Sequence, residues 1–430
     1  MMGEVVEIPA MDPQRFTISG HLVEPSKLNS DNFPTGVVVV KDRRNHSATS
    51  SKLSRSVILP RGPALLLRFV AQIAITFCLA VALSAADTKP PLRVAIAGLV
   101  HGHADGFFSH SLNRPEIQIV AIAEPDRALF DRYAAKFHLD PSLYHADLEE
   151  TLRSTKPQAV LVYTSTYDHR RVVELCAHYS VPVMMEKPLA VSYKDAQAIA
   201  RAARAAKIQV LVNYETSWYP SNHAAYDLVR SGAIGDIRKV VVHDGHQGPK
   251  EINVAPEFLK WLTDPELNGA GALFDFGCYG ADLMTWLMDG QRPLTVSAVT
   301  QQIKPDIYQH VDDEATIILT YPKAQAILQA SWNWPFDRKD MEVYGRIGSV
   351  FTIARNDVSV RLPHQALASD RAAAPIPKPY DDSLTYLRAV LLNGAKPDAL
   401  SSLETNLVVT EILDAARRSA SSGKTIRLPQ

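Results

Sequence analysis

The sequence has few of the residues that would indicate a disulfide-bonded, metal-binding or polyanion-binding protein. Three cysteines in 430 residues are too few for a disulfide framework, and no Cys-x-x-Cys pair or histidine–cysteine cluster indicates a metal site. We therefore expect no metal. The 45 basic and 46 acidic residues give a net charge of −1, which favours neither nucleic acid nor an anionic membrane as a partner. Without solenoid-type repeats, the length indicates two or three domains.

The first 63 residues show no sustained hydrophobic periodicity. They are polar and interrupted by prolines, with a basic cluster at 41–44 and a serine-rich stretch near 47–56. We interpret 1–63 as disordered, or as the result of a start codon assigned too far upstream. Initiation near Val57 is one alternative start.

An apolar segment follows at 64–86. Arg68 shortens its uninterrupted apolar core to about 15 residues, and the small residues Ser84 to Ala86 come after it. A basic flank, a short apolar core and small residues at a cleavage position are typical of a secretory signal, whereas a membrane anchor needs about 20 apolar residues. We predict a periplasmic or secreted protein without a stable membrane anchor after cleavage. If the segment is not a functional signal, the protein is cytoplasmic.

Short apolar runs alternate with helical patterns from Leu92 onward. The expected strands are 92–97, 117–123, 159–163, 181–185 and 209–212. The expected helices between them are 104–112, 126–137, 168–178 and 193–206. This alternation predicts a doubly wound parallel sheet with helices on both faces, a Rossmann dinucleotide-binding domain over 87–213. Ligands of such sheets bind beyond the carboxyl ends of the strands.

A degenerate glycine turn follows the first expected strand. In a G-x-G-x-x-G frame that starts at Gly98, Val100 and His103 occupy the second and third glycine places, while Gly102 keeps backbone freedom near a pyrophosphate. Glu124 lies about 20 residues beyond the turn, where a carboxylate accepts from both ribose hydroxyls and repels a 2′-phosphate. The pattern favours NAD over NADP. A helix-capping role is the alternative for Glu124.

Two polar groups follow later strands at the same expected edge, Thr164-Ser165-Thr166 and Glu186-Lys187-Pro188. An ammonium group beside a reacting hydroxyl lowers the hydroxyl's pKa and donates to its oxygen, so Lys187 is a candidate for oxidation chemistry. Pro188 restricts the backbone and helps to orient the lysine. From the residues alone, a solvated loop lysine remains open, as does a capping or ion-paired Glu186.

Glu186-Lys187-Pro188 after an apolar strand resembles the signature of the Gfo/Idh/MocA oxidoreductase family. Similar order extends through 96–98, 123–126, 148–152 and 231–235, and reaches 403–404 and 419–428. The resemblance implies hydride transfer between a sugar or polyol hydroxyl and a nicotinamide cofactor, in a homodimer or homotetramer. The expected cofactor contacts are Gly98, Val100, His101, Gly102, His103, Glu124, Thr164, Ser165, His169, Glu186 and Lys187.

Residues 269–282 resemble the family's G-G-x-L-x-D-x-G-x-H-x-x-D stretch, in which the Asp and the His project from one helix face. Here the Asp is Asp275, but Tyr279 replaces the His. Members similar to glucose–fructose oxidoreductase, xylose dehydrogenase and dihydrodiol dehydrogenase also carry tyrosine there, so the resemblance implies catalysis by Lys187, Tyr279 and Asp275. We expect the charges of Lys187 and the nicotinamide to lower the Tyr279 pKa from about 10. A half-buried aromatic that closes the cleft is the alternative.

The pattern shifts toward strands after residue 213. Strands are expected at 239–242, 294–299, 315–320 and 326–331, with helices at 222–231 and 281–288. They predict an α+β domain with a mostly antiparallel sheet over 214–430. The candidate substrate contacts are Asn213, Trp218, His243 and His246, although two solvated histidines are an equally consistent reading of the last pair.

Three functions fit these residues. The first is an NAD-dependent sugar or polyol oxidoreductase, and the second is a glycoside-cleaving enzyme that oxidises its substrate transiently with bound NAD. The third is a non-catalytic sugar-binding protein, which the replacement of histidine by Tyr279 would favour. An exported enzyme would need a tightly held cofactor, because free NAD is scarce outside the cytoplasm.

Overall fold

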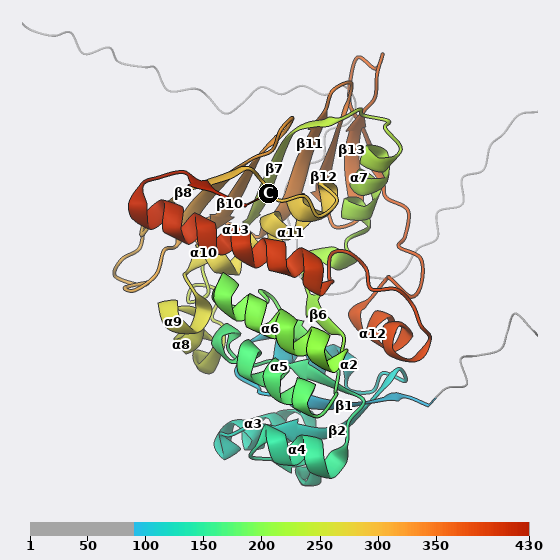
Figure 1. The fold of residues 1–430 in the computed structure, drawn as a ribbon, viewed down its shortest axis with the longest axis vertical. Coiled ribbons are helices and arrows are strands. Elements are labelled where there is room, and N and C mark those ends of the chain that lie inside the picture. The colour runs from blue at the N-terminus through green and yellow to red at the C-terminus, as the bar shows by residue number, and fades with distance from the viewer. Residues whose placement is uncertain (1–89, 430) are drawn as a thin grey trace, which may run out of the picture. The chain divides into compact units, whose positions relative to one another are not determined.

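The computed structural model describes residues 90–429. The predictions made for 1–63 and for the apolar segment 64–86 therefore lie outside the described residues. The described residues belong to one compact unit, which contains two β-sheets (Figure 1). Over 90–429, no helix has the length and apolar composition needed to cross a membrane.

The first sheet has six strands in the order β3-β2-β1-β4-β5-β6, and every neighbouring pair is parallel. The strands are β1 (Leu92–Ala97), β2 (Ile117–Ala123), β3 (Tyr144–His145), β4 (Ala159–Val162), β5 (Val183–Glu186) and β6 (Val210–Asn213). This is the strand order of a Rossmann fold. The predicted doubly wound parallel sheet is confirmed. The buried β-branched and alanine residues of β1 and β4 explain why helices cover both faces.

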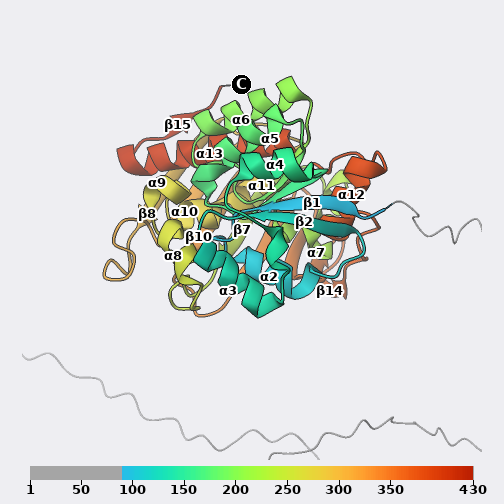
Figure 2. The same cartoon turned by 90° about the horizontal axis from the view of Figure 1, so that it is seen from below.

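Helices lie on both faces of this sheet, with α2 and α3 on one side and α4, α5 and α6 on the other (Figure 2). Their bounds are α2 (His103–Ser111), α3 (Arg127–Phe137), α4 (Leu148–Thr155), α5 (His169–His178) and α6 (Tyr193–Ala206). Side chains in the sequence set three of the starts: Asp126, Asp147 and Ser192 each accept hydrogen bonds from the first turn of α3, α4 and α6. Asp126, and not Glu124, caps α3. The alternative helix-capping role of Glu124 therefore does not apply to this helix.

The second sheet has nine strands in the order β14-β13-β12-β11-β7-β10-β9-β8-β15. All pairs are antiparallel except β7 with β10, so the predicted mostly antiparallel sheet is confirmed. The strands are β7 (Ile237–Gly245), β8 (Thr295–Gln301), β9 (Glu314–Thr320), β10 (Gln325–Ser331), β11 (Arg338–Gly345), β12 (Ser349–Ala354), β13 (Asp357–Arg361), β14 (Ser369–Ala372) and β15 (Ile426–Arg427). Burial alternates along β9 and β10, because one face of the sheet packs against helices and the other does not.

The helices of this second part are mostly short. They are α7 (Pro220–Arg230), α8 (Pro256–Leu262), α9 (Pro265–Asn268), α10 (Ala272–Asp275), α11 (Gly277–Leu287), α12 (Ser383–Leu392) and α13 (Leu403–Ser422). Every residue of α11 is buried. It packs against β7, β10 and α13, and so lies between the sheet and the long C-terminal helix.

The C-terminal segment returns to the first sheet. Leu384 and Leu387 of α12 belong to the hydrophobic core formed by β1, β2, α2 and α3, and the amide of Val212 in β6 donates to the carbonyl of Ser401 at 2.9 Å. Helix α13 contacts both α6 and β8, and Figure 1 shows it in red between them. Contacts therefore cross the domain boundary that the sequence predicts between residues 213 and 214.

Candidate active site

Lys187 and Asp275 form a buried ion pair where the carboxyl end of β5 meets the end of α10. The Lys187 Nζ donates to Asp275 Oδ1 at 2.5 Å and to the Asp275 backbone oxygen at 2.9 Å. Each residue is 6% exposed. The indole Nε1 of Trp332, at the end of β10, donates to the other carboxylate oxygen at 2.9 Å. The structure thus brings two of the three predicted catalytic residues into direct contact.

The ion pair keeps both partners charged. Burial lowers the pKa of Lys187, but Asp275, Cys278 and Glu186 together raise it more, and the net pKa lies above its usual value. Burial raises the pKa of Asp275, but Lys187, His246 and the Trp332 indole together lower it more, so the net pKa lies below its usual value. Lys187 is consequently an ammonium group, and Asp275 a carboxylate, across the neutral range.

Asp275 and Tyr279 do not lie on one continuous helix, so the expectation of a shared helix face is wrong. Helix α10 ends at Asp275, Phe276 has φ −107° and ψ −32°, and α11 starts at Gly277. The amide of Tyr279 donates to Phe276 O and not to Asp275 O, as an uninterrupted helix would require. The Asp275 carbonyl instead accepts from Lys187 Nζ and from Cys278 Sγ, which explains the break.

Tyr279 lies between two lysines. The Nζ atoms of Lys187 and of Lys339, the latter on β11, are each 5.1 Å from the centroid of its ring. The expected lowering of the Tyr279 pKa is wrong for this arrangement: the pKa lies well above its usual value, because the ring is buried and because Glu215 adds negative charge. The two ammonium groups do not offset this effect, since Asp275 neutralises Lys187 and Glu215 neutralises Lys339.

Four predicted cofactor residues line one cavity at the carboxyl ends of β1, β2 and β4. Gly98, Val100, Glu124 and Thr164 are among the residues around this space of about 190 Å³. The other lining residues are Ala97, Ala123, Pro125, Ala146, Asp147, Leu148, Asp168, Arg171, Val172 and Leu175. Arg171 was missed by the sequence reasoning because a helical arginine has no local signal for ligand contact. Its guanidinium adds a positive charge suited to a phosphate.

The backbone around this cavity needs glycine at its turn. Gly98 has φ +77°, and a Cβ there would lie 2.7 Å from Thr164 Cγ2. The Glu124 carboxylate accepts from the amide of Leu99 at 2.8 Å and from that of Asp126 at 2.9 Å, which ties the turn to the end of β2. A tight turn, a carboxylate at the neighbouring strand end and a nearby arginine fit the adenosine and pyrophosphate parts of NAD.

The remaining residues of the glycine turn face the second sheet's helices. His101 is buried, and its ring centroid lies 4.8 Å from that of Phe258 and 5.4 Å from that of Trp261, both on α8. A Cβ on Gly102 would lie 2.9 Å from Phe258. Trp261 Nε1 also donates to Val100 O at 3.1 Å. Helix α8 therefore closes over the turn, a contact that no local sequence pattern indicated.

His103 and Glu186 form a second polar pair near the catalytic lysine. His103 Nδ1 lies 2.8 Å from Glu186 Oε2, and the other oxygen accepts from Asn213 Nδ2 at 3.1 Å. With His101, the potential ligand atoms of this group lie within 4.8 Å of one another. Ligands of a cation with bonds of about 2.0–2.2 Å are separated by at most about 4.4 Å. We therefore assign no metal to this group as it stands.

Ser165 and His169 are buried and do not line the cofactor cavity. Ser165 Oγ donates to Asp168 Oδ2 at 2.8 Å. His169 Nδ1 lies 3.1 Å from the carbonyl oxygen of Pro188. Burial lowers the pKa of His169 to about 4, so its imidazole is neutral and donates to that carbonyl. In this arrangement His169 supports the loop that carries Lys187.

The four predicted substrate contacts occupy three different places. Trp218 Nε1 donates to Asn213 Oδ1 at 3.0 Å, which places both residues in the network of Glu186. His243 pairs with Asp340 on β11 at 2.9 Å. His246 lines a groove that also includes Phe276, the residue after Asp275.

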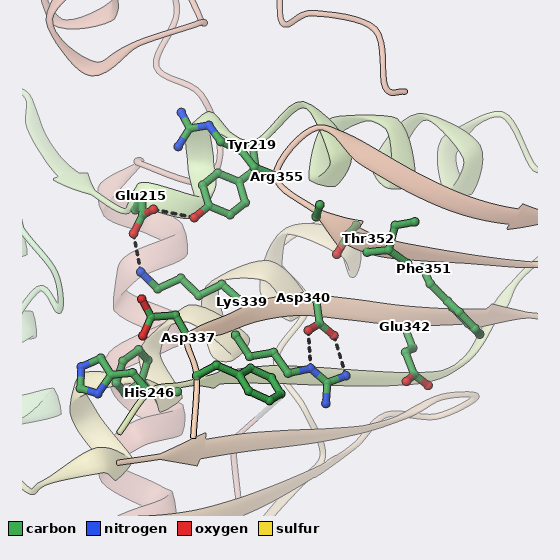
Figure 3. A pocket seen from close by; sticks show the side chains of 16 residues that line it. Glu215, Tyr219, His246, Asp337, Lys339, Asp340, Glu342, Phe351, Thr352 and Arg355 are labelled. Carbon is green, nitrogen blue, oxygen red and sulfur yellow. Dashed lines mark hydrogen bonds and ion pairs between the residues drawn. The ribbon is translucent and has the colours of Figure 1, made fainter. Parts of the chain in front are cut away.

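That groove, of about 680 Å³, is lined by residues of β11 and β12 (Figure 3) and also by Phe276, the residue after Asp275. Glu215, which binds both Tyr219 and Lys339, lines its inner end. Asp244 is buried nearby, and its pKa is well above its usual value because burial disfavours the carboxylate. Sequence reasoning missed Lys339 and Asp244, because β11 was not expected and a single aspartate within a strand has no distinctive pattern.

Family models match the chain on both sides of this site. The model described as an oxidoreductase family with an NAD-binding Rossmann fold matches residues 92–214. The GFO/IDH/MocA C-terminal domain model matches residues 222–351. The predicted NAD-binding domain is thereby confirmed.

Curated relatives have low sequence identity to this chain. Trans-1,2-dihydrobenzene-1,2-diol dehydrogenase of Macaca fuscata fuscata is 26% identical over 212 residues, which are 49% of this chain and 59% of the relative. The protein of that name from Xenopus tropicalis is 28% identical over 216 residues, 50% of this chain and 61% of the relative. The similarity therefore spans less than two thirds of these relatives.

Solved structures with low sequence identity share the fold. Aldose-aldose oxidoreductase from Caulobacter crescentus, complexed with glycerol, has a TM-score of 0.67 at 23% identity and covers 79% of this chain and 100% of its own. An inositol dehydrogenase homolog from Azotobacter vinelandii, complexed with NAD+, has a TM-score of 0.68 at 19% identity, with coverage of 79% and 98%. With both domain models matched in the family's order, this chain belongs to the GFO/IDH/MocA family of oxidoreductases.

Proposed function

We propose that this protein oxidises a hydroxyl group of a sugar or polyol and reduces the corresponding carbonyl in the reverse direction, with NAD as cofactor. The observation that carries the proposal is the Lys187–Asp275 ion pair, 2.5 Å long and buried beside Tyr279. It lies at the carboxyl edge of the sheet that also holds the cofactor cavity.

Lys187, Asp275 and Tyr279 have different roles in the proposed reaction. When bound, NAD+ supplies the acceptor for the hydride that leaves the carbinol carbon. The Lys187 ammonium donates a hydrogen bond to the substrate oxygen and stabilises negative charge on it. Asp275 holds the ammonium in place through two contacts. Tyr279 gives a proton to the oxygen during carbonyl reduction and takes it back during oxidation.

Replacing Lys187 by alanine tests this proposal. We expect Lys187→Ala to lower kcat by about a hundredfold or more, because it removes the donor to the reacting oxygen. The NAD dissociation constant should change by less than about threefold, since the cofactor cavity does not include Lys187. Turnover would be followed as NADH absorbance with a panel of hexoses and polyols, and NAD binding by calorimetry.

The matched control is Lys194→Ala, which removes an exposed lysine from α6. It should leave both quantities unchanged. If Lys187→Ala keeps wild-type turnover, the assigned role is wrong. If the wild-type protein binds no NAD and gives no sugar-dependent absorbance change, a non-catalytic sugar-binding role replaces the proposal. Release of an aglycone from glycosides would instead identify the glycoside-cleaving reaction.

The remaining predictions concern location and assembly. We propose that 64–86 directs export and that the exported enzyme retains its NAD tightly. The support is the short apolar core with a basic flank. Mass spectrometry of the native protein would reveal the mature N-terminus and a retained cofactor together. A homodimer or homotetramer is also proposed, and sedimentation velocity would test it.

A further inference from the structure

A buried carboxyl group with an unpaired oxygen lies near the end of β7. Asp244 is 1% exposed, and its Oδ1 atom has no hydrogen-bond partner among the described residues. A buried polar atom without a partner is costly and is uncommon in folded proteins. Such an atom points to a ligand or a water molecule as its partner.

Asp244 lies on the helix-covered face of the second sheet. In the antiparallel pair of β7 and β11, Asp244 is opposite Lys339, and Val242 is opposite Met341. Directly opposite residues share a face of a sheet, and so do alternate residues along one strand. Val242 and Met341 belong to the hydrophobic core, and α11 packs against β7. Asp244 and Lys339 are therefore on the face that α11, which carries Tyr279, covers.

The charged groups around Asp244 belong to the candidate active site. The charges of Lys339, Lys187 and Glu215 are among those that act on its carboxyl group. The Nζ atoms of Lys187 and Lys339 each lie 5.1 Å from the centroid of the Tyr279 ring. Both lysines already have a carboxylate partner. Asp244 thus lies beside the reacting groups, and neither lysine is left to pair with it.

An uncharged form of Asp244 fits these surroundings. Burial raises its pKa well above the usual value, and Lys339 and Lys187 do not offset the effect of burial. A protonated carboxyl group has one O–H donor and an acceptor oxygen. A hydroxyl group is also both a donor and an acceptor, so it satisfies this side chain, whereas an ammonium group would require the carboxylate.

We propose that Asp244 binds a second hydroxyl group of the substrate, on the carbon next to the one that is oxidised beside Lys187 and Tyr279. The Lys339 side chain reaches from the strand position opposite Asp244 to the Tyr279 ring, a separation short enough for one vicinal diol to contact both groups. This inference rests on the proposed oxidation of a sugar or polyol, and it adds a specificity-determining residue. The hydride and proton transfers remain those described above.

Substrate analogues that lack one hydroxyl group test the proposal. The full-length processed protein, with NAD, would be assayed by NADH absorbance with its best hexose or polyol and with the monodeoxy analogues of that compound. We expect kcat/KM to fall at least about thirtyfold for the analogue without the hydroxyl next to the oxidised carbon, because a buried polar group is then left unpaired. Analogues deoxygenated at more distant carbons should each lose less.

Two substitutions assign the effect to Asp244. Asp244→Ala removes both oxygens, so it should lower kcat/KM for the parent compound at least about tenfold and reduce the difference between parent and analogue to about threefold or less. Asp244→Asn keeps a donor and an acceptor at the same positions, so it should retain most of the difference. Thermal melts would verify that both variants fold.

The matched control is Asp282→Asn, which changes another buried carboxyl group. Asp282 is fully buried, and neither of its carboxylate oxygens has a hydrogen-bond partner among the described residues. The charge that acts on it is that of Asp398, which does not belong to the candidate active site. Asp282→Asn should leave the discrimination between parent and analogue unchanged.

The possible results separate the two proposals. If the wild type or Asp244→Ala gives a result contrary to these expectations, or if Asp244→Asn loses the discrimination as completely as Asp244→Ala, the assignment of Asp244 is refuted and the oxidoreductase function stands. An amino analogue at the neighbouring carbon that outperforms the hydroxyl compound would identify an ammonium ligand and overturn the inference. If no sugar or polyol reduces NAD, the proposed function fails, and this inference fails with it.

Discussion

At the scale of single residues, the charges around Tyr279 determine when it can accept a proton. Burial raises its pKa most, and Glu215 raises it further. Glu215 is itself paired with Lys339, and the pKa of Glu215 is lowered to about 2 because Lys339, Tyr219 and His103 together outweigh the effect of burial. Oxidation needs Tyr279 as a base, so we expect its rate to rise with pH above neutrality.

Substitutions of Lys339 and of Glu215 should shift the pH dependence of the oxidation rate in opposite directions. Lys339→Met leaves the negative charge of Glu215 unopposed, which disfavours phenolate and moves the rising limb of the oxidation rate to higher pH. Glu215→Gln removes that negative charge and moves the limb to lower pH. Each shift should be about 0.5–1 pH unit, equivalent to about 0.7–1.4 kcal/mol. The measurement is kcat/KM for oxidation between pH 6 and 10.

The exposed Lys424→Met variant serves as the control for loss of a positive charge and should leave the profile in place. Shifts of the same sign in Lys339→Met and Glu215→Gln would contradict the assignment of Tyr279 as the titrating group.

At the scale of secondary-structure elements, the turn between β1 and α2 depends on one glycine. Gly98→Ala places a Cβ 2.7 Å from Thr164 Cγ2 in a left-handed conformation. We expect the free energy of unfolding to fall by about 1–2 kcal/mol, and NAD binding to weaken as the turn moves. Gly106→Ala within α2 meets nothing within 4 Å and should raise stability by about 0.5–1 kcal/mol.

Urea denaturation, with and without NAD, would measure both glycine variants. Equal stability for Gly98→Ala and Gly106→Ala would show that the left-handed turn does not control this segment.

Helix α11 carries a buried carboxylate without hydrogen-bond partners among the described residues. Asp282 is fully buried, and neither carboxylate oxygen is paired. Burial holds its pKa well above its usual value, so the folded protein binds a proton there that the unfolded chain releases above about pH 4. The stability contributed by this protonation is present at acid pH and is lost as the pH rises.

Asp282→Asn removes the cost of this proton uptake while keeping the shape of the side chain. We expect the variant to be more stable than the wild type by about 1–3 kcal/mol at pH 7.5, with a smaller gain at pH 4.5. Thermal unfolding at the two pH values would measure it. A gain that is the same at both would mean that Asp282 is not the titrating group.

At the scale of the molecule, the C-terminal segment joins the two sheets. The amide of Asn406 on α13 donates to the carbonyls of Leu400 and Ser402, and its oxygen accepts from Tyr214, which follows β6. The contacts with Tyr214 and Leu400 are buried, and unpaired polar groups are costly there. Because α13 also packs against β8, we expect both sheets to unfold together.

Asn406→Ala tests this coupling. The variant should lower the free energy of unfolding by about 1–3 kcal/mol, since it removes the side-chain partners of the Leu400 carbonyl and the Tyr214 hydroxyl. Tryptophan fluorescence and bound-NAD signals should lose their native values in one coincident transition. Ser421→Ala, on the exposed end of the same helix, should have no effect. Two separated transitions would mean that the domains unfold independently.

Much of the first sheet could be predicted because its elements are coded locally. Strand β1 and helix α6 have the expected bounds, since an apolar run and a capped helical pattern each determine their own structure. Strands β11 to β14 were not expected. In β11 the inward position before Met341 and Val343 is taken by Lys339, a charged residue that interrupts the apolar alternation. Their pairing is set by neighbours distant in the sequence.

The sequence by itself determined the Rossmann order, the glycine at the first turn, and the candidate trio of Lys187, Asp275 and Tyr279. These features depend on local patterns or on motif spacing. Only the tertiary structure decided which charges surround the trio: Lys339 and Glu215 reach Tyr279 from separate segments, and burial reverses the expected direction of its pKa. The reason is physical, because electrostatic energies depend on distance and desolvation in the folded protein, and neither is encoded in a short stretch of sequence.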